Sequence, residues 1–289
     1  MIYLLSVNYY STNLIARLIS SLSASPTSLY QVVVVNNSPD DQTLHQLQAP
    51  SLQILEAKSN LGFGKACNLG LSWIYQQDPH AFVWLLNPDT YLPPNTLEKV
   101  PAFFDAYPEL SILSTLIYTT TGEIWFAGGQ FIPQRGAILS TNLLASHTEA
   151  AYVPCDWVSG CSLLLNLRHF PQCPEFDPAY FLYYEDFDFC RRYAMQGHHI
   201  AVTPQIAIVH EAGAIANRNL TQKLKHSTYS YLLTLERYTN PLVFWVRFFR
   251  LTLYALILLG IKPQLALGKL AGVSSYVRQS RHHLANIEQ

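Results

Sequence analysis

The stretch YQVVVVNNSPDD, residues 30–41, decides the fold class of this chain. Four successive valines with no polar residue among them are typical of a strand covered on both faces, as in a parallel sheet flanked by helices. The run ends at Asn, Ser, Pro and Asp, which favour turns. We therefore expect a buried parallel strand that places polar side chains at its carboxyl end.

Strand and helix patterns alternate on both sides of this stretch. Apolar runs predict strands at residues 2–7, 52–57 and 81–86, and apolar periodicity predicts helices after Ser11 and over about 65–76. Further strands are predicted at 110–118, 199–203 and 206–210, a hairpin within 119–137, and a helix over 185–196 that ends at Gly197. Beyond Thr221 the pattern is helical. The order predicts an α/β fold followed by a helical region.

Composition narrows the class of protein. Charged residues make up 13% of the 289, against about 25% in an average soluble domain, and the net charge of −1 gives no reason to expect nucleic acid as a partner. Five scattered cysteines without a C-x-x-C motif exclude a disulfide framework or zinc ribbon and favour buried thiols in a cytosolic protein. The first residues, MIYLLSVNYYS, lack a basic region, so we expect a strand there and no signal peptide.

Polar residues collect where the first four predicted strands end. Ligands of open α/β sheets bind outside the carboxyl ends of the strands. A turn explains each cluster alone, but four clusters in register predict one binding cleft. The clusters are Asn8-Tyr9, Asn36-Asn37-Ser38, Asn60 to Gly64, and Asn87 to Thr90.

The stretch NLGFGKACNLGL, residues 60–71, suits a bound anion. Gly62 and Gly64 allow close backbone approach or positive φ. A helix beginning just after them favours a pyrophosphate, and Lys65 adds positive charge. The pattern is neither G-x-G-x-x-G nor a P-loop, so those nucleotide-binding classes do not apply.

Asp89 follows the buried strand FVWLL, in the turn NPD. It is either a turn residue or a ligand for Mg²⁺ or Mn²⁺, which take carboxylate and phosphate oxygens. His210, at the end of a later strand, is either structural or a further metal ligand.

The stretch FLYYEDFDFCRRY, residues 181–193, holds Glu185, Asp186 and Asp188. Acidic residues favour helix N-termini by ~0.3–1 kcal/mol, which explains one carboxylate better than three. Burial beside the aromatic run would raise a carboxylate pKa and suit a general base, whereas pairing with Arg191 or Arg192 would lower it. The sequence alone leaves open whether the pKa of these carboxylates is raised or lowered.

Seven ordered motifs resemble family 2 glycosyltransferases with the GT-A fold, most of all their bacterial rhamnosyltransferase-like branch. The resemblance covers about residues 1–215. The motifs are SVNYYS, VVVVNNSPDD, NLGFGKACNLGL, LLNPDTYL, VSGCSLLLN, YFLYYEDFDFCRR and VHEAGA.

The resemblance implies a GT-A domain over residues 1–218, with a mixed, mostly parallel sheet flanked by helices, and a helical appendage over 219–289. It implies inverting transfer of rhamnose or another hexose from a dTDP- or UDP-linked donor to a hydroxyl of a glycan or lipid-linked acceptor. Asp186 would be the base with Glu185 in support, and Asp89 and His210 would hold a divalent cation, Mg²⁺ or Mn²⁺. Gly160, Cys161 and Asp188 would lie on the acceptor side. The donor nucleotide would contact Asn8, Tyr9, Asn36, Asn37, Ser38, Asn60, Gly62, Phe63, Lys65, Asn68 and Asn87.

Two departures from the family pattern bear on this expectation. Asn36 stands where an Asp is usual, which could alter base preference. Asn87 replaces the first carboxylate of D-x-D, so metal affinity should be modest. The alternatives are a catalytically idle nucleotide-sugar-binding domain and a sugar nucleotidyltransferase, and the glycine-free first turn disfavours the second.

The stretch PLVFWVRFFRLTLYALILLGIKP, residues 241–263, is apolar but interrupted by Arg247 and Arg250. Its uninterrupted run of 11 residues is short of the ~20 that span a membrane. We expect a helix lying in a membrane interface, with the protein peripheral on the inner face of the cytoplasmic membrane. The alternative is a helix packed on the catalytic domain or in a homodimer.

Overall fold

The computed structural model describes residues 1–287, apart from 24, 50, 212 and 214–218. The chain forms two compact units. The sheet unit comprises Met1–Gln130, Leu139–Ala179 and Asp186–Ala212; the helical unit comprises Phe131–Ile138, Tyr180–Glu185 and Gly213–Gln289. The expected domain boundary at 218 and part of the VHEAGA motif lie outside the described residues.

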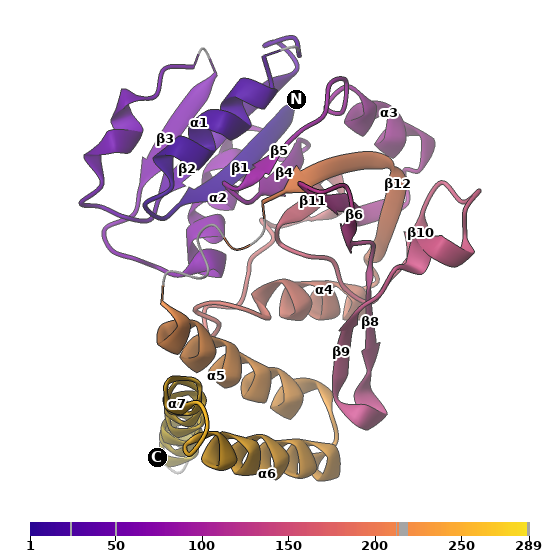
Figure 1. The fold of residues 1–289 in the computed structure, drawn as a ribbon. Coiled ribbons are helices and arrows are strands. Elements are labelled where there is room, and N and C mark those ends of the chain that lie inside the picture. Colours follow the sequence, from indigo (N-terminus) through magenta and orange to yellow (C-terminus); the bar gives the residue numbers. More distant parts are fainter. Residues whose placement is uncertain (24, 50, 212, 214–218, 288–289) are drawn as a thin grey trace. The chain divides into compact units, whose positions relative to one another are not determined.

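The sheet unit is built on a ten-stranded sheet with the order β10-β12-β6-β11-β4-β1-β2-β3 (Figure 1). The main strands are β1 (Ile2–Asn8), β2 (Tyr30–Asn36), β3 (Leu52–Glu56), β4 (Phe82–Leu86), β6 (Leu110–Thr119), β10 (Val153–Pro154), β11 (Ser162–Asn166) and β12 (His199–His210). β5 (Thr90–Tyr91) pairs with β12, and β7 (Ile124–Phe126) pairs with β6. Strands β1 to β4 pair in parallel, whereas β11 runs antiparallel to both neighbours. The mixed, mostly parallel sheet is confirmed.

Helices cover both faces of this sheet. Helices α1 (Thr12–Ser21) and α3 (Lys99–Ala106) share one core with Val34, and α2 (Phe63–Gln77) and α4 (Glu185–Met195) share the other with Val35. Adjacent valines of one strand therefore enter opposite cores, which is the reason for the unbroken apolar run in the sequence. All five cysteines are free.

Strand β12 is one continuous strand, although the sequence predicted two. Its parallel pairing with β6 shifts register between Thr203 and Ala207, so that the three residues beginning at Pro204 form a bulge. Proline lacks the N–H that a ladder needs, and the bulge accommodates it.

The hairpin expected within residues 119–137 is two structures. The chain first turns back so that β7 pairs antiparallel with β6, and then forms a separate hairpin of β8 (Gly129–Ile132) and β9 (Ala137–Ser140). Short 3₁₀ turns complete the connections at η1 (Gln42–Gln46), η2 (Pro133–Arg135), η3 (Leu143–Ser146) and η4 (Leu167–His169).

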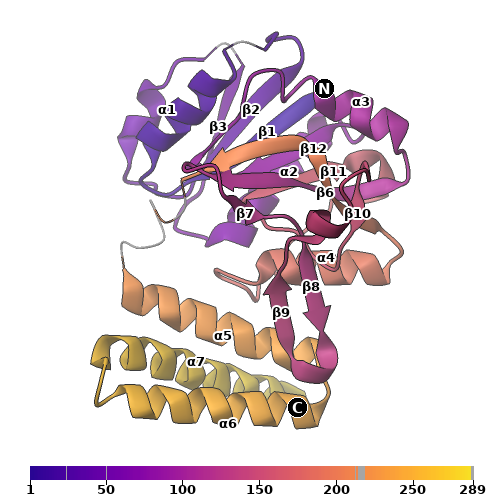
Figure 2. The same ribbon diagram turned by 45° about the vertical axis from the view of Figure 1, so that its right-hand side comes forward.

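The helical unit contains α5 (Leu220–Tyr238), α6 (Pro241–Leu258) and α7 (Pro263–Ile287). Asn219 and Asn240 cap α5 and α6, each accepting the backbone N–H of the third residue of its helix. Helix α7 packs against both other helices (Figure 2). A Cβ on Gly272 would lie 2.6 Å from the carbonyl oxygen of Lys225, so this glycine permits the close approach of α7 to α5.

Candidate active site

The carboxyl ends of the parallel strands meet at one edge of the sheet, as the sequence predicted. Asn8 of β1 lies opposite Asn36 of β2, which in turn lies opposite Glu56 of β3. Strand β4 runs parallel to β1 on its other side and ends at Leu86. The clusters that follow these strands therefore share one edge.

Buried amides connect the strand ends. The Asn8 Nδ2 group donates to Asn36 Oδ1 at 3.2 Å, and Asn36 Nδ2 donates to Glu56 Oε2 at 3.0 Å. Asn8 Oδ1 accepts both the backbone N–H and the hydroxyl of Ser11 at 2.9 Å, which fixes the start of α1. Asn8 and Asn36 are fully buried. Their side chains brace the edge of the sheet from within.

Aromatic side chains lie exposed beside these amides. Tyr9 and Tyr10 are 40% and 46% exposed, with their rings packed edge to face at 5.0 Å. Tyr10 takes a φ of +50°, its N–H donates to the hydroxyl of Ser38 at 3.0 Å, and its own hydroxyl donates to Asp40 at 2.7 Å. Exposed rings of this kind can stack on a nucleobase.

The loop before α2 is organised by Asn37. Its Nδ2 donates to Asn60 Oδ1 at 3.1 Å and to the Gly62 carbonyl at 3.2 Å, while its Oδ1 accepts the N–H of Leu61 at 2.8 Å. Gly62 takes a φ of +79°, which favours glycine, and α2 begins at the next residue. Lys65 is exposed in the first turn. The loop presents a helix N-terminus and a cation at the strand edge, both suited to a diphosphate.

Asn68, expected to contact the nucleotide, is hydrogen-bonded to the backbone of Phe176. Its Nδ2 donates to the carbonyl of Phe176 at 2.8 Å, and its Oδ1 accepts the N–H of the same residue at 2.7 Å. Both ends of the amide are thus bonded to one backbone unit. Asn68 anchors the loop around Phe176 to α2.

Asp89 and His210 form a buried pair. Asp89 Oδ1 lies 3.2 Å from His210 Nε2, and the two residues are 6% and 5% exposed. The ladder between β5 and β12 brings them together, because Thr90 lies opposite His210 and the N–H of Glu211 donates to the Asp89 carbonyl at 2.8 Å. Within the described part of the chain, His210 Nδ1 has no hydrogen-bond partner.

Trp125 packs on the ring of His210, a contact that no sequence pattern predicted. Its ring lies edge to face on the His210 ring, with centroids 4.5 Å apart. Strand β7 carries Trp125 to this position by pairing with β6. No group of three His, Cys, Asp or Glu that could enclose a metal occurs among the described residues.

The turn between β4 and β5 joins this pair to the next motif. Asn87 donates its N–H to the carbonyl of Cys161 at 3.1 Å, and its own carbonyl accepts the hydroxyl of Thr90 at 2.7 Å. Asn87 is half-buried. Its backbone thus fixes the turn that places Asp89.

Asp186 is held at the first turn of α4. Its Oδ2 accepts the N–H of Gly160 at 2.9 Å, and its Oδ1 accepts the N–H of Phe187 at 2.8 Å. Burial raises the pKa of Asp186, against the effect of these two hydrogen bonds. Burial raises the pKa of the Cys161 thiol, and the charges of Asp89 and Asp186 add to this effect. Cys161 follows Gly160, which bonds Asp186, and its carbonyl accepts the N–H of Asn87, two residues before Asp89. Cys161 therefore lies near both the metal-binding candidate and the candidate base.

Gly160 lies against Phe63 and Asp186. A Cβ built on it would be 3.0 Å from Phe63 Cε1 and 3.6 Å from the Asp186 Cβ. Phe63 is in turn packed edge to face on Phe176 at 6.2 Å. The residue at 160 must be small for Asp186 to keep this position.

Glu185 precedes Asp186 in the chain but belongs to the helical unit, where it is buried. The segment leading to it is bonded to α5: the Ser230 hydroxyl donates to the Leu182 carbonyl at 2.9 Å. Tyr183 and Tyr184 take φ of +71° and +64°, a conformation that costs about 1–3 kcal/mol for each non-glycine residue. The segment entering the acidic pair is strained and held by contacts to α5.

Asp188, expected on the acceptor side, is bonded within α4. Its side chain is fully buried, and its Oδ2 accepts the Nε–H of Arg192 at 2.7 Å. Arg191 pairs instead with Asp156 at 3.3 Å. Of the two neighbouring arginines, Arg192 is thus the partner of Asp188, and Arg191 is paired elsewhere.

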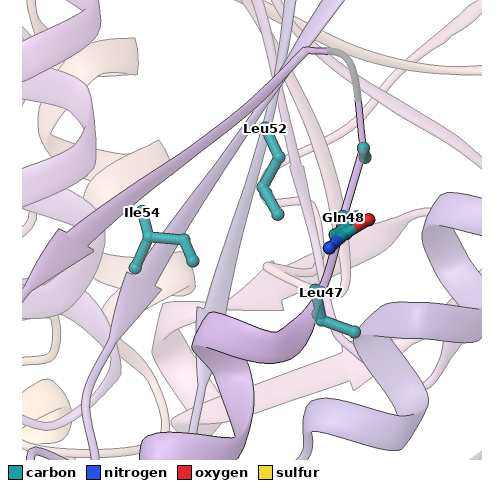
Figure 3. Close-up of a pocket in the computed structure, with 5 residues that line it drawn as sticks. Leu47, Gln48, Leu52 and Ile54 are labelled. Carbon is teal, nitrogen blue, oxygen red and sulfur yellow. The ribbon is translucent and has the colours of Figure 1, made fainter.

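A separate pocket of about 530 Å³ lies beside the edge strand β3. Figure 3 shows Leu47, Gln48, Leu52 and Ile54 around it. Its lining is mostly apolar and includes no residue of the strand-end clusters. It does not form part of the candidate active site.

Known proteins similar to this chain agree on the kind of enzyme. The N-acetylglucosaminyl-diphospho-decaprenol L-rhamnosyltransferase of Mycobacterium tuberculosis (strain ATCC 25618 / H37Rv) is 24% identical over 81% of this chain and 84% of its own length. The rhamnosyltransferase WbbL of Escherichia coli (strain K12) is 22% identical over 73% of this chain and 84% of its own length.

Solved structures are similar in fold. GalNAc-T7 with UDP, GalNAc and Mn²⁺ matches with a TM-score of 0.63 at 13% identity, over 88% of this chain but only 50% of that one. Residues 1–349 of S. aureus TarS with UDP-GlcNAc match with a TM-score of 0.53 at 17% identity, over 98% of this chain and 91% of that one. The GT-A fold expected from the sequence is confirmed.

The family model described as Glycosyl transferase family 2 matches residues 5–158, more than half of the chain. This span includes the strand-end amides, the Gly62 loop and Asp89. With the GT-A sheet and the rhamnosyltransferase relatives, the match shows that this chain belongs to glycosyltransferase family 2, whose members transfer a sugar from a nucleotide donor.

Proposed function

We propose that this chain is an inverting rhamnosyltransferase that moves the sugar of a dTDP- or UDP-linked donor to a hydroxyl of a lipid-linked glycan. The relatives named above support the sugar and the acceptor class, since both are named rhamnosyltransferases and one is named for a diphospho-decaprenol acceptor. The observation that carries the proposal is the carboxylate of Asp186, held by Gly160 and lying, like Asp89, near Cys161.

The donor nucleotide is assigned to the carboxyl edge of the sheet. The exposed rings of Tyr9 and Tyr10 offer a surface for the base. The N-terminus of α2, with Gly62 and Lys65, offers backbone N–H groups and a cation for the diphosphate. Asn8 and Asn36 act indirectly, by bracing the strands from which these groups project.

A divalent cation fits beside Asp89 and His210. The pair offers a buried carboxylate oxygen and an imidazole nitrogen 3.2 Å apart, and Mn²⁺ accepts both kinds of ligand. The diphosphate oxygens would complete the coordination. When bound, such an ion would stabilise negative charge on the departing nucleoside diphosphate.

The acceptor is activated by Asp186. Its carboxylate takes the proton of the acceptor hydroxyl as that oxygen forms a bond to the anomeric carbon. The bond between the anomeric carbon and the diphosphate oxygen breaks, and its electron pair leaves with the nucleoside diphosphate. Attack from the face opposite the leaving group inverts the anomeric centre, through an oxocarbenium-like transition state. The raised pKa of Asp186 suits proton uptake better than that of an exposed aspartate would.

The test of the base is Asp186→Asn, with Glu185→Gln as the matched variant. A panel of nucleotide sugars with Mn²⁺ and a lipid-linked acceptor identifies the donor by the nucleoside diphosphate released. We expect Asp186→Asn to abolish transfer while calorimetric donor binding stays within a few fold. If Asp186→Asn transferred sugar at the wild-type rate and Glu185→Gln were inactive, the base would be Glu185 and not Asp186. Donor binding without turnover by the unaltered chain would support an idle binding domain.

The test of the metal pair is Asp89→Ala, with His210→Ala as its companion. We expect each to weaken binding of the nucleoside diphosphate in Mn²⁺ far more than in EDTA. Equal losses in both conditions would make Asp89 a turn residue only.

A further inference from the structure

The helical unit is basic, although the chain as a whole is not. Residues 219–289 carry nine Lys and Arg against two Glu, a formal charge of +7, whereas the whole chain carries −1. The preceding residues therefore carry a formal charge of −8. Helix α6 contains no acidic residue. A charge asymmetry of this size favours a negatively charged partner for the helical unit alone.

Helix α6 has a long apolar face that the unit leaves exposed. Only three of its residues, Phe244, Ala255 and Leu258, are buried. Its exposed apolar residues recur three or four positions apart, and each is 50–74% exposed; they are Leu242, Trp245, Val246, Phe249, Leu253, Leu256 and Ile257. We call this set the outer face of α6. Soluble proteins rarely expose a continuous apolar patch of this kind without a partner for it.

A pocket of about 310 Å³ lies between α5, α6 and α7, and three cationic side chains line it. Its lining, which we call the cationic pocket, consists of Tyr231, Arg247, Arg250, Leu251, Tyr254 and Lys269. None of these lining residues is acidic. Three cations at one hollow provide the donors that a phosphate group requires.

Two of the cations are held in place by the helical unit. Arg247 donates its Nε–H to the carbonyl of Arg135 at 2.7 Å, and its Nη2 group donates to the same oxygen. The Lys269 ammonium lies over the ring of Tyr254 at 5.8 Å, and burial lowers the pKa of this lysine. A bound anion would offset the cost of burying that charge.

The cationic pocket borders the outer face of α6. Arg250 lies four residues after Val246 and seven before Ile257, which places it on the same side of the helix as these apolar residues. A phosphate in the pocket would thus lie next to apolar side chains. A membrane interface has this combination, with phosphate head groups directly above acyl chains.

We propose that α6 lies in the interface of an anionic membrane, with its outer face among the acyl chains and a lipid head-group phosphate in the cationic pocket. This inference does not depend on the proposed reaction.

Three observations favour this arrangement over others. Helix α6 passes the length and composition test for a membrane-crossing helix, alone among the described helices. However, Arg247 and Arg250 near its middle make a spanning position costly. A second copy of the chain would bring another unit of like charge against the first, whereas an anionic surface attracts it.

Flotation of the full chain with vesicles tests the proposal. Vesicles of phosphatidylcholine with phosphatidylglycerol should bind the protein, vesicles of phosphatidylcholine alone should bind it at least about tenfold more weakly, and high salt should weaken the binding. Equal binding to both kinds of vesicle, or to neither, would overturn the proposal.

Two variants separate the pocket from the outer face. Arg250→Gln with Lys269→Gln should weaken vesicle binding about 25-fold, because each basic residue near a membrane contributes about fivefold. The control Arg278→Gln, an exposed cation of α7, should change it by less than about twofold. Trp245→Ser with Phe249→Ser should abolish binding. Donor hydrolysis without vesicles checks that each variant is folded.

Two further measurements distinguish the alternative occupants. Inorganic diphosphate that bound the pocket without weakening vesicle binding would point to a soluble phosphate ligand and overturn the lipid assignment. Light scattering measures whether the chain forms a dimer. If Trp245→Ser with Phe249→Ser converted a dimer to a monomer and left vesicle binding unchanged, the outer face would be a dimer interface.

Discussion

Replacing Gly160 by alanine should move the candidate base without removing it. The added Cβ would lie 3.0 Å from Phe63 Cε1 and 3.6 Å from the Asp186 Cβ. Carbon atoms pack best at about 3.5–4.0 Å, so the ring and the backbone must separate by about 0.5 Å or more. Because the Gly160 N–H donates to Asp186 Oδ2, any movement of this backbone is passed to the carboxylate.

The size of the effect follows from this contact. Overpacking a filled site costs typically about 1–3 kcal/mol, which in a chain of this size lowers Tm by about 2–10 °C. Misplacing a catalytic group by about 1 Å can cost about 100-fold in rate. We therefore expect Gly160→Ala to lower kcat by about 10- to 100-fold, while donor binding changes by less than about threefold.

Transfer kinetics and thermal melts measure the two effects together. The double variant Gly160→Ala with Phe63→Leu removes the clashing ring atoms and should recover part of both losses. Gly260→Ala is the control, because no atom lies within 4 Å of its Cβ position. A Gly160→Ala enzyme with a lowered Tm but unchanged kcat would show that the contact serves packing only and that Asp186 is not positioned by it.

Three further predictions follow from individual contacts. Asp188→Ala should lower the free energy of unfolding by about 1.5–3 kcal/mol, because it removes the carboxylate that pairs with Arg192. At a temperature where the variant is folded, kcat should be unchanged. A selective loss of acceptor affinity would instead support the acceptor-side role of Asp188. Asn68→Ala should lower Tm by releasing the backbone of Phe176, with a smaller effect on donor affinity, and calorimetry with a nucleoside diphosphate checks this. The raised pKa of Asp186 should make kcat/KM fall with decreasing pH at a higher pH than an exposed aspartate would give. Because the pKa of Asp186 is raised in the folded state, its contribution to the free energy of unfolding is fully present below the ordinary pKa of aspartate. That contribution is lost as the pH rises through the pKa of Asp186 in the folded state. The Tm of Asp186→Asn should therefore exceed that of wild type most at alkaline pH.

The sequence could predict the edge of the sheet where the site lies, because that information is local. An unbroken valine run requires burial on both faces, and turn residues mark where each strand stops. Parallel pairing then brings Asn8 and Asn36 to one edge without further information. The α/β order and the helical C-terminal region were predictable for the same reason.

The partner of each polar side chain was not predictable, because it depends on contacts between distant parts of the chain. Asn68 and Asp188 have side chains suited to ligand binding, yet one bonds the backbone of Phe176 and the other bonds Arg192. Trp125 carries no local signal, since only the pairing of β7 with β6 brings it to His210. The sequence predicted separate strands at 199–203 and 206–210, but the ladder with β6 resumes after the bulge that begins at Pro204.

The bulge in β12 has a consequence for how this enzyme tolerates insertions and deletions. Thr203 lies opposite Thr115, and Ala207 lies opposite the next residue of β6, Leu116, so three residues are extra. An odd number of extra residues inverts which side chains face each side of the sheet. Deleting one residue here would place Glu211 where His210 now stands opposite Thr90, and would remove the imidazole from Asp89. Among relatives, we therefore expect a length change at this bulge to be accompanied by a histidine displaced by the same number of positions.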